Sequence, residues 1–519
     1  MRRRLVVLGV GLVSLALPVS AAWAQTPPTM TDARLDVRPA VEGLTGPTSI
    51  AFLGPNDLLV LEKATGRVKH VVDGQVAGIP LDLAVNSASE RGLLGIALHP
   101  DFPTNPGVYL YWTCRTPGPG PDNFTPAARE CDESQMLGAD TNVTLATPLL
   151  GNRVDRFVWD AATQTLSFDR HLISLRSFQA DGAPEPPDQG DGAQNAAGNH
   201  NGGVIRFGPD GKLYVIMGDN GRRGRMQNLP CGPTPVCEGP FRNVGPVFAD
   251  DQFGGPEPDD AHLTGFVLRM NDDGSAPTNN PFWGIGQSFG GEAGENLKKV
   301  FAIGIRNSFG MAFDPVSGDL WEQENGDDTF DEINRVERGM NGGWVQLAGP
   351  IDRVAQFREM ETTFGGRSLQ QLRWPPTNIA DTPDEVKRRL LSTLPVAHFS
   401  DPEFSWKWAV PPGGIGFVDG NGLGEDFAGD LFVGGATQGT VGGHLFRFKL
   451  DKHRTNFELD DPRLADRVAD NNAKADITES ESLLAGRSFG IVTDIQTGSD
   501  GHLYAVSTNR GTIYEIFPR

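Results

Sequence analysis

Short apolar segments recur along the chain, each followed by a turn rich in Pro, Asp or Gly and then by a second apolar segment. Apolar and polar positions alternate on either side of turns such as Asp210-Gly211 and Asp500-Gly501. Period-two alternation flanking such a turn is typical of a β-hairpin. Six hairpins are predicted: Ile50–Phe52 with Leu58–Val60, Ile96–Leu98 with Val108–Leu110, Ile205–Phe207 with Leu213–Val215, Met311–Phe313 with Asp319–Trp321, Ile415–Phe417 with Leu431–Val433, and Ile495–Thr497 with Leu503–Ala505.

Repeated small sheets bury both of their faces when they are arranged radially around one axis. The six copies therefore predict an all-β fold, a six-bladed β-propeller, as one domain over residues 25–519. The uneven spacing of the copies indicates long loop insertions near residues 178–199, 225–260 and 353–398. The last insertion is predicted to be partly helical and to lie over one mouth of the propeller, because Thr382-Pro383-Asp384-Glu385 combines an N-cap, a first-turn proline and a capping-box acid.

Composition supports many short strands joined by turns. The chain has 65 glycines and 39 prolines in 519 residues, about one residue in five, which disfavours a coiled coil or helical bundle. Its formal net charge is −21, and no internal basic patch offsets it. A strongly acidic surface repels phosphate backbones, so nucleic acid is excluded as a partner.

The N-terminus has the features of a secretory signal peptide. Three arginines, Arg2 to Arg4, precede the apolar stretch Leu5–Val19, and Ala22-Trp23-Ala24 supplies small residues for cleavage after Ala24. The apolar stretch is short for a membrane span. We expect residues 1–24 to be removed and the mature protein to be periplasmic or secreted, with no membrane span.

The four cysteines form two close pairs, Cys114 with Cys131 and Cys231 with Cys237. Export places them in a compartment where disulfides persist, so two local disulfides are predicted. A zinc site built from all four thiolates is the alternative, but the sequence lacks the Cys-x-x-Cys knuckles of such sites.

The candidate catalytic residues are His200 and Asp219. His200 lies in a glycine-rich loop before the strand at Ile205, and Asp219 follows the next strand. Residues that flank one hairpin start and finish at the same end of a sheet, so the two side chains are expected to meet. A neutral imidazole oriented by a carboxylate can accept a proton from a substrate hydroxyl. The alternative is a loop histidine bonded to backbone and an aspartate that caps a turn.

An acid-rich segment, Trp321–Asn334, is a candidate metal site. It carries six carboxylates within eleven residues, and such a group needs cations or amides to offset its repulsion. Calcium, which prefers several oxygen ligands, is one solution, and a solvated acidic loop is the alternative. Upstream, Arg306 and Asn307 are candidates for binding a substrate or cofactor carbonyl, although such an arginine more often pairs with a neighbouring acid.

Several familiar catalytic motifs are absent from the sequence. Neither a Gly-x-Gly-x-x-Gly nor a Gly-x-Ser-x-Gly segment lies between a predicted strand and a predicted helix, and the sequence has no Walker loop and no His-x-x-x-His pair. These absences disfavour nicotinamide binding, serine hydrolysis and a first-row catalytic metal.

The sequence resembles the soluble family of glucose/sorbosone (aldose sugar) dehydrogenases that depend on pyrroloquinoline quinone (PQQ). The likeness rests on Gly92–Phe102, the hairpin from His200 to Asp219, Arg306-Asn307 with Ala312–Pro315, and Asn325-Gly326 with Asp331–Asn334.

The resemblance implies a six-bladed propeller whose mouth binds PQQ and Ca²⁺. It implies His200 as the base and Asp219 as its partner. It also implies Arg306, Asn307 and Asn325 as cofactor contacts, with Asn325 where a glutamine is usual, and Gly326 and Asp327 as calcium ligands through their carbonyls.

Besides Asn325, the sequence departs from the family pattern in four places. The calcium turn is Gly326-Asp327 where Gly-Pro is common, and Thr437, Ile491 and Thr493 align where a lysine and two arginines are expected. Each lost charge-assisted hydrogen bond to the quinone acids is worth about 1.5–3 kcal/mol. We therefore expect weaker or rearranged quinone binding.

Three functions follow from these observations. The leading hypothesis is an exported PQQ-dependent oxidoreductase that oxidises an aldose or related sugar or polyol and passes electrons to a soluble acceptor. One alternative is a calcium-dependent propeller hydrolase of the lactonase kind. The other is a non-catalytic binding propeller that has lost PQQ.

Overall fold

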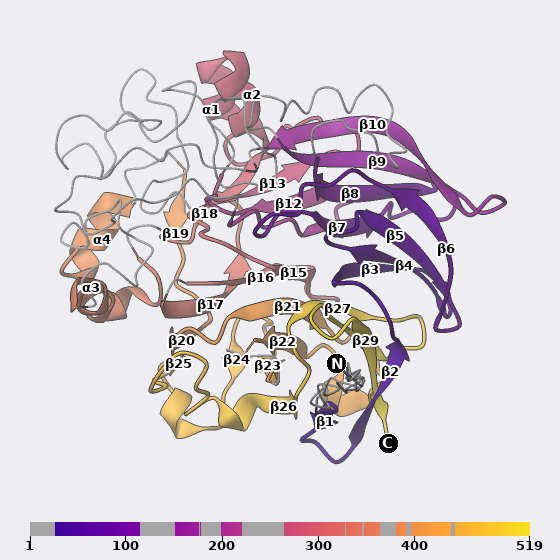
Figure 1. Cartoon of the computed structure of the whole chain (residues 1–519). Helices are drawn as coiled ribbons and strands as arrows, with labels where there is room; N and C mark the ends of the chain where they lie inside the picture. Colours follow the sequence, from indigo (N-terminus) through magenta and orange to yellow (C-terminus); the bar gives the residue numbers. More distant parts are fainter. Residues whose placement is uncertain are drawn as a thin grey trace, which may run out of the picture.

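The structure is a computed structural model that describes residues 26–114, 151–175, 177, 199–220, 264–326, 328–344, 347–363, 380–390, 396–436 and 442–519. Strands dominate these residues, and they are arranged as a β-propeller (Figure 1). The predicted all-β propeller fold is therefore confirmed. The signal segment 1–24, Cys131, Cys231 and Cys237 lie outside the described residues, so the cleavage and both disulfides stay predictions.

The strands form six sheets, and in five of them the main strands follow one another along the chain. The first is β3 (Pro47–Gly54), β4 (Asp57–Glu62), β5 (Arg67–Val72) and β6 (Gln75–Asp82). The second is β7 (Leu93–Leu98), β8 (Gly107–Thr113), β9 (Asn152–Asp160) and β10 (Thr165–Leu175). The third is β11 (Ile205–Phe207), β12 (Leu213–Met217), β13 (Phe266–Met270) and β14 (Val300–Ile303), extended by β18 (Met340–Asn341) and β19 (His398–Phe399).

The next two sheets also receive short additional strands. The fourth is β15 (Gly310–Phe313), β16 (Leu320–Glu324), β17 (Thr329–Val336), β20 (Phe404–Trp408) and β25 (Val468–Ala469). The fifth is β21 (Pro412–Phe417), β22 (Leu431–Gly435), β23 (His444–Leu450), β26 (Leu484–Arg487) and β1 (Thr29–Met30), with β24 (Phe457–Glu458) paired to β23.

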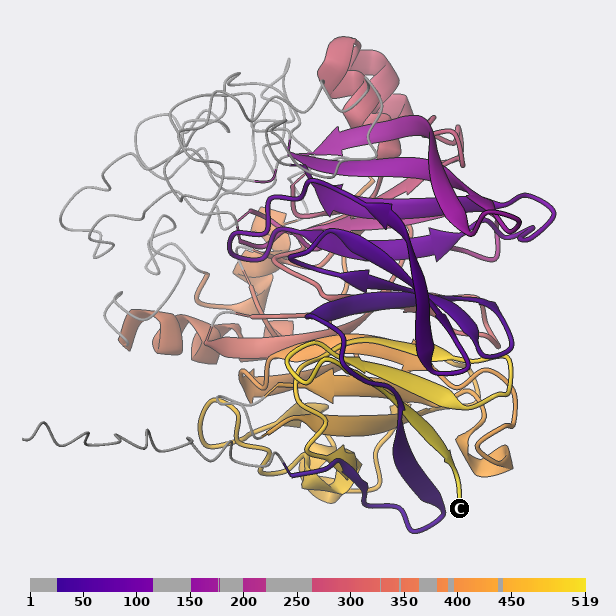
Figure 2. The ribbon, with the colours of Figure 1, turned by 45° about the vertical axis from the view of Figure 1, so that its right-hand side comes forward.

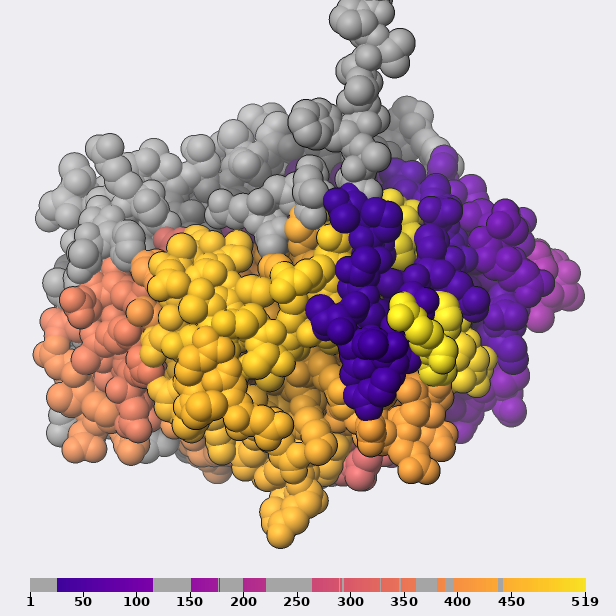
Figure 3. All heavy atoms as spheres, turned by 90° about the horizontal axis from the view of Figure 1, so that it is seen from below, coloured from indigo at the N-terminus to yellow at the C-terminus, as the bar shows by residue number. Residues whose placement is uncertain are grey.

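The closing sheet combines both ends of the described chain. It consists of β27 (Val492–Thr497), β28 (Leu503–Ser507), β29 (Thr512–Pro518) and β2 (Leu35–Val41), with Val37 opposite Ile516. Figure 3 shows the N-terminal segment against the C-terminal one. The sequence repeats predict six blades, one for each copy. The structure instead has five blades built from consecutive strands, and its closing sheet needs β2 from the other end of the chain because β29 would otherwise expose an unpaired edge.

The inner strands form a closed ring. β3, β7, β11, β15, β21 and β27 contact one another in this order, and β27 contacts β3 again. All six predicted hairpins are present, as the pairs Ile50 with Val60 and Ile495 with Ala505 illustrate. The hydrophobic core lies between neighbouring sheets, where Leu59 packs in one cluster with Trp112 and Val60 in another with Val506.

The helices lie outside the ring of strands, as Figure 2 shows for α1 and α2 at one end and α3 at the side. They are α1 (Trp283–Phe289), α2 (Gly291–Lys299), α3 (Val354–Thr363), α4 (Pro383–Leu390) and the short 3-10 helices η5 (Ile351–Arg353), η7 (Glu425–Phe427), η8 (Pro462–Leu464) and η9 (Glu481–Leu483). The predicted helical character of residues 353–398 is confirmed, and the Thr382 hydroxyl accepts the Glu385 N–H at 3.3 Å. Most of insertion 178–199 and all of 225–260 lie outside the described residues.

A glycine permits the close approach of β7 to β11. A Cβ atom on Gly95 would lie 2.1 Å from the Gly203 carbonyl oxygen, whereas one on Gly54 in β3 would meet no atom within 4 Å. We expect Gly95→Ala to lower the free energy of unfolding by about 1–3 kcal/mol because the strands would be pushed apart. Urea denaturation checks this, with Gly54→Ala as the matched control, and equal midpoints for the two variants would contradict it.

Candidate active site

The hairpin of β11 and β12 brings His200 and Asp219 together. Nδ1 of His200 lies 2.6 Å from Oδ1 of Asp219, and the two residues are 4% and 1% exposed. The expected contact between the two side chains is therefore present, whereas the alternative had the histidine bonded to backbone and the aspartate capping a turn. His200 has a φ of +53°, an unusual conformation for this residue type that indicates a fixed loop geometry.

Further groups hold this pair in place. The other oxygen of Asp219 accepts the indole N–H of Trp344 at 2.8 Å, so the carboxylate cannot rotate freely. The Glu90 carboxylate accepts the backbone N–H of His200 at 2.6 Å and the side-chain amide of Asn307 at 3.1 Å. The imidazole is thus fixed through its ring and through its backbone.

Arg306 connects this pair to the acid-rich segment. Its carbonyl accepts the backbone N–H of Asp219 at 2.8 Å. Its guanidinium donates to the carbonyls of Asn325 at 2.6 Å and Gly326 at 2.8 Å, and it lies 5.4 Å from the centre of the Trp344 ring. The two groups of residues singled out in the sequence therefore form one site, while Asp327 lies outside the described residues.

The acid-rich segment is buried, so its interpretation as a solvated loop is wrong. Glu322, Glu324, Asp331 and Glu332 are at most 5% exposed. Asp331 accepts the N–H groups of Gly326 at 2.8 Å and Val410 at 2.6 Å. Amide groups thus supply much of the compensation that these acids need.

The buried glutamates of this segment hold their protons tightly. Burial raises the pKa of Glu322 to about 7 and that of Glu332 to about 8, and the Asn334 amide donates to both side chains. Burial and the charges of these two neighbours raise the pKa of Glu324 well above its usual range. Because desolvation disfavours the charged form, this cluster shares protons near neutral pH.

Buried polar atoms without partners indicate that the site takes a polar ligand. Both side-chain amide atoms of Asn220 and Oδ1 of Asn307 are buried and make no hydrogen bond to the described residues. An unpaired buried polar group is costly unless a ligand satisfies it. These atoms, with the Arg306 guanidinium nearby, fit a ligand that carries carbonyl and carboxylate groups, as PQQ does.

Two of the three positions that lack the expected cations, Ile491 and Thr493, are among the described residues, and both carry neutral side chains. Ile491 is 39% exposed, and the Thr493 hydroxyl lies 3.4 Å from the Pro47 carbonyl. Thr437 lies outside the described residues.

Sequence reasoning missed Glu90, Asn220 and Trp344. Glu90 lies two residues before the motif at Gly92, and Asn220 directly follows Asp219. Both residues lie next to segments already identified as candidates, and this closeness in sequence is the signal that could have indicated them. Trp344 reaches Asp219 from 125 residues away, and no local pattern indicates that contact.

Comparison with known proteins identifies relatives. The family model described as Glucose / Sorbosone dehydrogenase matches residues 44–148 and 248–359. Quinoprotein glucose dehydrogenase B of Acinetobacter calcoaceticus is 28% identical over 342 residues, which are 65% of this chain and 58% of that relative. Aldose sugar dehydrogenase YliI of Escherichia coli (strain K12) is 23% identical over 511 residues, which are 98% of each chain.

A solved structure shares the fold. The PQQ-bound form of aldose sugar dehydrogenase from Streptomyces coelicolor is 21% identical, covers 94% of this chain and 99% of its own, and has a TM-score of 0.52. No helix among the described residues is long and apolar enough to cross a membrane. The family match, the relative that covers nearly the whole chain and the shared propeller all point the same way: the chain is similar to the glucose/sorbosone dehydrogenase family.

Proposed function

We propose that this chain, as one propeller unit over residues 25–519, is an exported PQQ-dependent dehydrogenase that oxidises a hydroxyl of an aldose or related polyol. The family match and the names of its relatives support a sugar dehydrogenase. The observation that carries the proposal is the 2.6 Å contact between Nδ1 of His200 and Asp219, beside buried amides that lack partners.

His200 is proposed to act as the general base. An ionised Asp219 keeps the imidazole proton on Nδ1, which leaves the lone pair of Nε2 available to the substrate. Nε2 makes no hydrogen bond to the described residues. The substrate hydroxyl proton passes from oxygen to Nε2 as a hydride leaves the carbon that carries this hydroxyl, and Asp219 stabilises the imidazolium that forms.

Arg306, Asn307 and Asn220 are proposed to hold the quinone. The guanidinium suits a carboxylate or quinone oxygen, and the two amides supply donors and acceptors that lack partners. When bound, the quinone supplies the two-electron acceptor for the hydride.

The calcium predicted at Gly326 does not fit the arrangement of this turn. The carbonyls of Asn325 and Gly326 both accept hydrogen bonds from the Arg306 guanidinium. A calcium ion at the same oxygens would face that positive charge at close range. We therefore assign no step of the reaction to calcium.

The proposal is tested with the purified mature protein, residues 25–519. Quinone, a panel of aldoses and polyols and an artificial dye acceptor are added, in parallel with and without calcium. We expect dye reduction only when quinone and a sugar are both present. Lactone hydrolysis without quinone would instead favour the hydrolase, and absence of quinone binding at high micromolar concentration would favour a binding propeller.

Arg306→Ala should weaken quinone binding by about tenfold or more. The reason is the loss of a charge-assisted hydrogen bond, worth about 1.5–3 kcal/mol. A spectroscopic quinone titration measures the effect. Arg447→Ala is the matched control, because this arginine pairs with Asp430 in the fifth sheet. Equal affinities of the wild type and the Arg306 variant would remove Arg306 from the binding site.

A further inference from the structure

Three potential metal ligands converge on the closing sheet. Nδ1 of His502 lies 2.7 Å from Oε1 of Glu515 and 3.3 Å from Oδ2 of Asp500. The three ligand atoms all lie within 4.8 Å of one another, and among the described residues this is the one set of three or more His, Cys, Asp or Glu side chains that does so. We propose that Asp500, His502 and Glu515 bind a first-row divalent cation, with Zn²⁺ as the best match.

This cluster lies away from the candidate active site. Asp500 and His502 belong to the turn between β27 and β28, which corresponds to the turn between β11 and β12 at Asp210. His200 and Asp219 flank the opposite end of the hairpin formed by β11 and β12. The proposed metal site is therefore on the other face of the propeller, and it is independent of the proposed sugar oxidation.

The third sheet contains a similar contact between a tyrosine and a turn aspartate, but an arginine takes the place of the glutamate. In both sheets a tyrosine hydroxyl donates to the turn aspartate, from Tyr214 to Asp210 at 3.2 Å and from Tyr504 to Asp500 at 2.8 Å. The residue paired with Tyr214 is Arg269, and its guanidinium contacts Asp210 at 2.7 Å.

In the closing sheet, Glu515 takes the position of that arginine, opposite Tyr504. A second carboxylate thus replaces the cation that offsets Asp210. Two facing carboxylates repel each other unless a positive charge lies between them. The imidazole of His502 contacts both carboxylates, so one nitrogen and two oxygen ligands converge there.

The distances are close to those of a zinc site. Zinc bonds to imidazole nitrogen and carboxylate oxygen are about 2.0–2.2 Å long, so neighbouring ligand atoms in a tetrahedral site lie about 3.3 Å apart. The observed separations of 2.7 and 3.3 Å need only small side-chain movements. The His502 and Asp500 side chains are 24% and 39% exposed, so an ion can enter and water can complete its coordination.

Outer contacts orient the carboxylate of Asp500. The His502 backbone N–H donates to Oδ1 of Asp500 at 3.0 Å, and the Tyr504 hydroxyl donates to Oδ2. Hydrogen bonds of this kind commonly fix metal-binding carboxylates.

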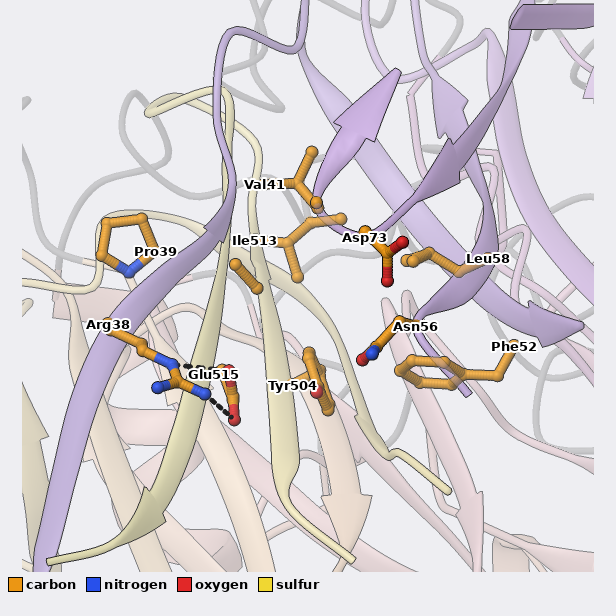
Figure 4. Close-up of a pocket in the computed structure, with 12 residues that line it drawn as sticks. Arg38, Pro39, Val41, Phe52, Asn56, Leu58, Asp73, Tyr504, Ile513 and Glu515 are labelled. Carbon is orange, nitrogen blue, oxygen red and sulfur yellow. Dashed lines mark hydrogen bonds and ion pairs between the residues drawn. The ribbon is translucent and has the colours of Figure 1, made fainter. Parts of the chain in front are cut away.

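Arg38 is the competitor of the metal. It donates to both oxygens of Glu515, at 2.8 and 2.9 Å (Figure 4). Its side chain is 59% exposed, so it can move away from the Oε1 atom that the metal needs. Arg38, Tyr504 and Glu515 also line a cavity of about 310 Å³, which gives the arginine room.

Zinc titration of the mature protein tests the proposal, with calcium in excess so that oxygen-rich sites are filled. We expect one Zn²⁺ per chain, and for Co²⁺ the visible absorption bands of a four- or five-coordinate site. His502→Ala and Glu515→Gln should each lower the zinc affinity at least about tenfold and remove the Co²⁺ bands. Asp210→Ala, at the matching turn of the third sheet, should change neither.

Arg38→Ala is expected to change the zinc affinity in the opposite direction. If the guanidinium competes for Glu515, its removal should tighten zinc binding several-fold. Circular dichroism confirms folding, and should Glu515→Gln fail to fold, the variant at the partly exposed His502, His502→Ala, decides the test. Absence of stoichiometric zinc binding, or equal zinc affinity in wild type and His502→Ala, would overturn the proposal.

Discussion

His200→Asn is expected to abolish quinone-dependent sugar oxidation while the protein stays folded. Loss of a general base lowers kcat by about 10²–10⁴-fold. Asparagine is the suitable replacement because it tolerates the φ of +53° at this position and keeps the backbone N–H that donates to Glu90. The measurement is the steady-state rate of dye reduction at saturating quinone and sugar.

His171→Ala is the matched control for this experiment. Its Nδ1 lies 2.7 Å from Asp155, so it forms another His–Asp contact, but it belongs to β10 and has no hydrogen bond to Arg306 or Asn307. We expect this variant to retain its kcat. Full activity in His200→Asn, or equal losses in both variants, would exclude the proposed role of His200.

The free energy of unfolding is expected to fall as the pH rises from about 4.5 to 8. Burial raises the pKa of Glu322 to about 7 and that of Glu332 and Glu403 to about 8, against an ordinary value of 4.5. In this range the unfolded chain releases these protons while the folded chain retains them. Each such group therefore removes about 1.4 kcal/mol of stability per pH unit until its folded pKa is reached.

Glu322→Gln is expected to flatten this dependence and to stabilise the protein at pH 8 by on the order of 1–3 kcal/mol. Glutamine is neutral at every pH, and its carbonyl can still accept the Asn334 amide that Glu322 accepts at 2.8 Å. Chemical denaturation at pH 5 and pH 8 measures both effects. Glu458→Gln, at a half-exposed glutamate paired with Lys449, is the control. Stability that rises over this range would contradict the assignment of these protons.

Local patterns predicted the hairpins and the meeting of His200 with Asp219. Both follow from period-two alternation and from the geometry of one short hairpin, which a single stretch of sequence encodes. The buried state of Glu322 and Glu332 was not predictable in this way, because a dense run of acids is usual at a solvated surface. In the folded protein the Gly349 N–H donates to Glu332, and the Asn334 amide donates to both side chains.

Contacts between distant segments account for the rest. Trp344 bonds to Asp219 from a position 125 residues further along the chain, and Arg306, after β14 of the third sheet, bonds to the turn after β16 of the fourth sheet, where calcium was predicted. No alternation or spacing within one element encodes them.

The pairing of β2 with β29 has a consequence for biosynthesis. Val37 and Ile516 face each other across nearly the whole length of the chain. A nascent polypeptide emerging from the ribosome cannot complete this sheet until the residues of β29 have been translated, and such a distant contact forms slowly. Closure of the ring therefore has to follow the synthesis of all the other sheets, so the propeller cannot become a closed ring before β29 has been made.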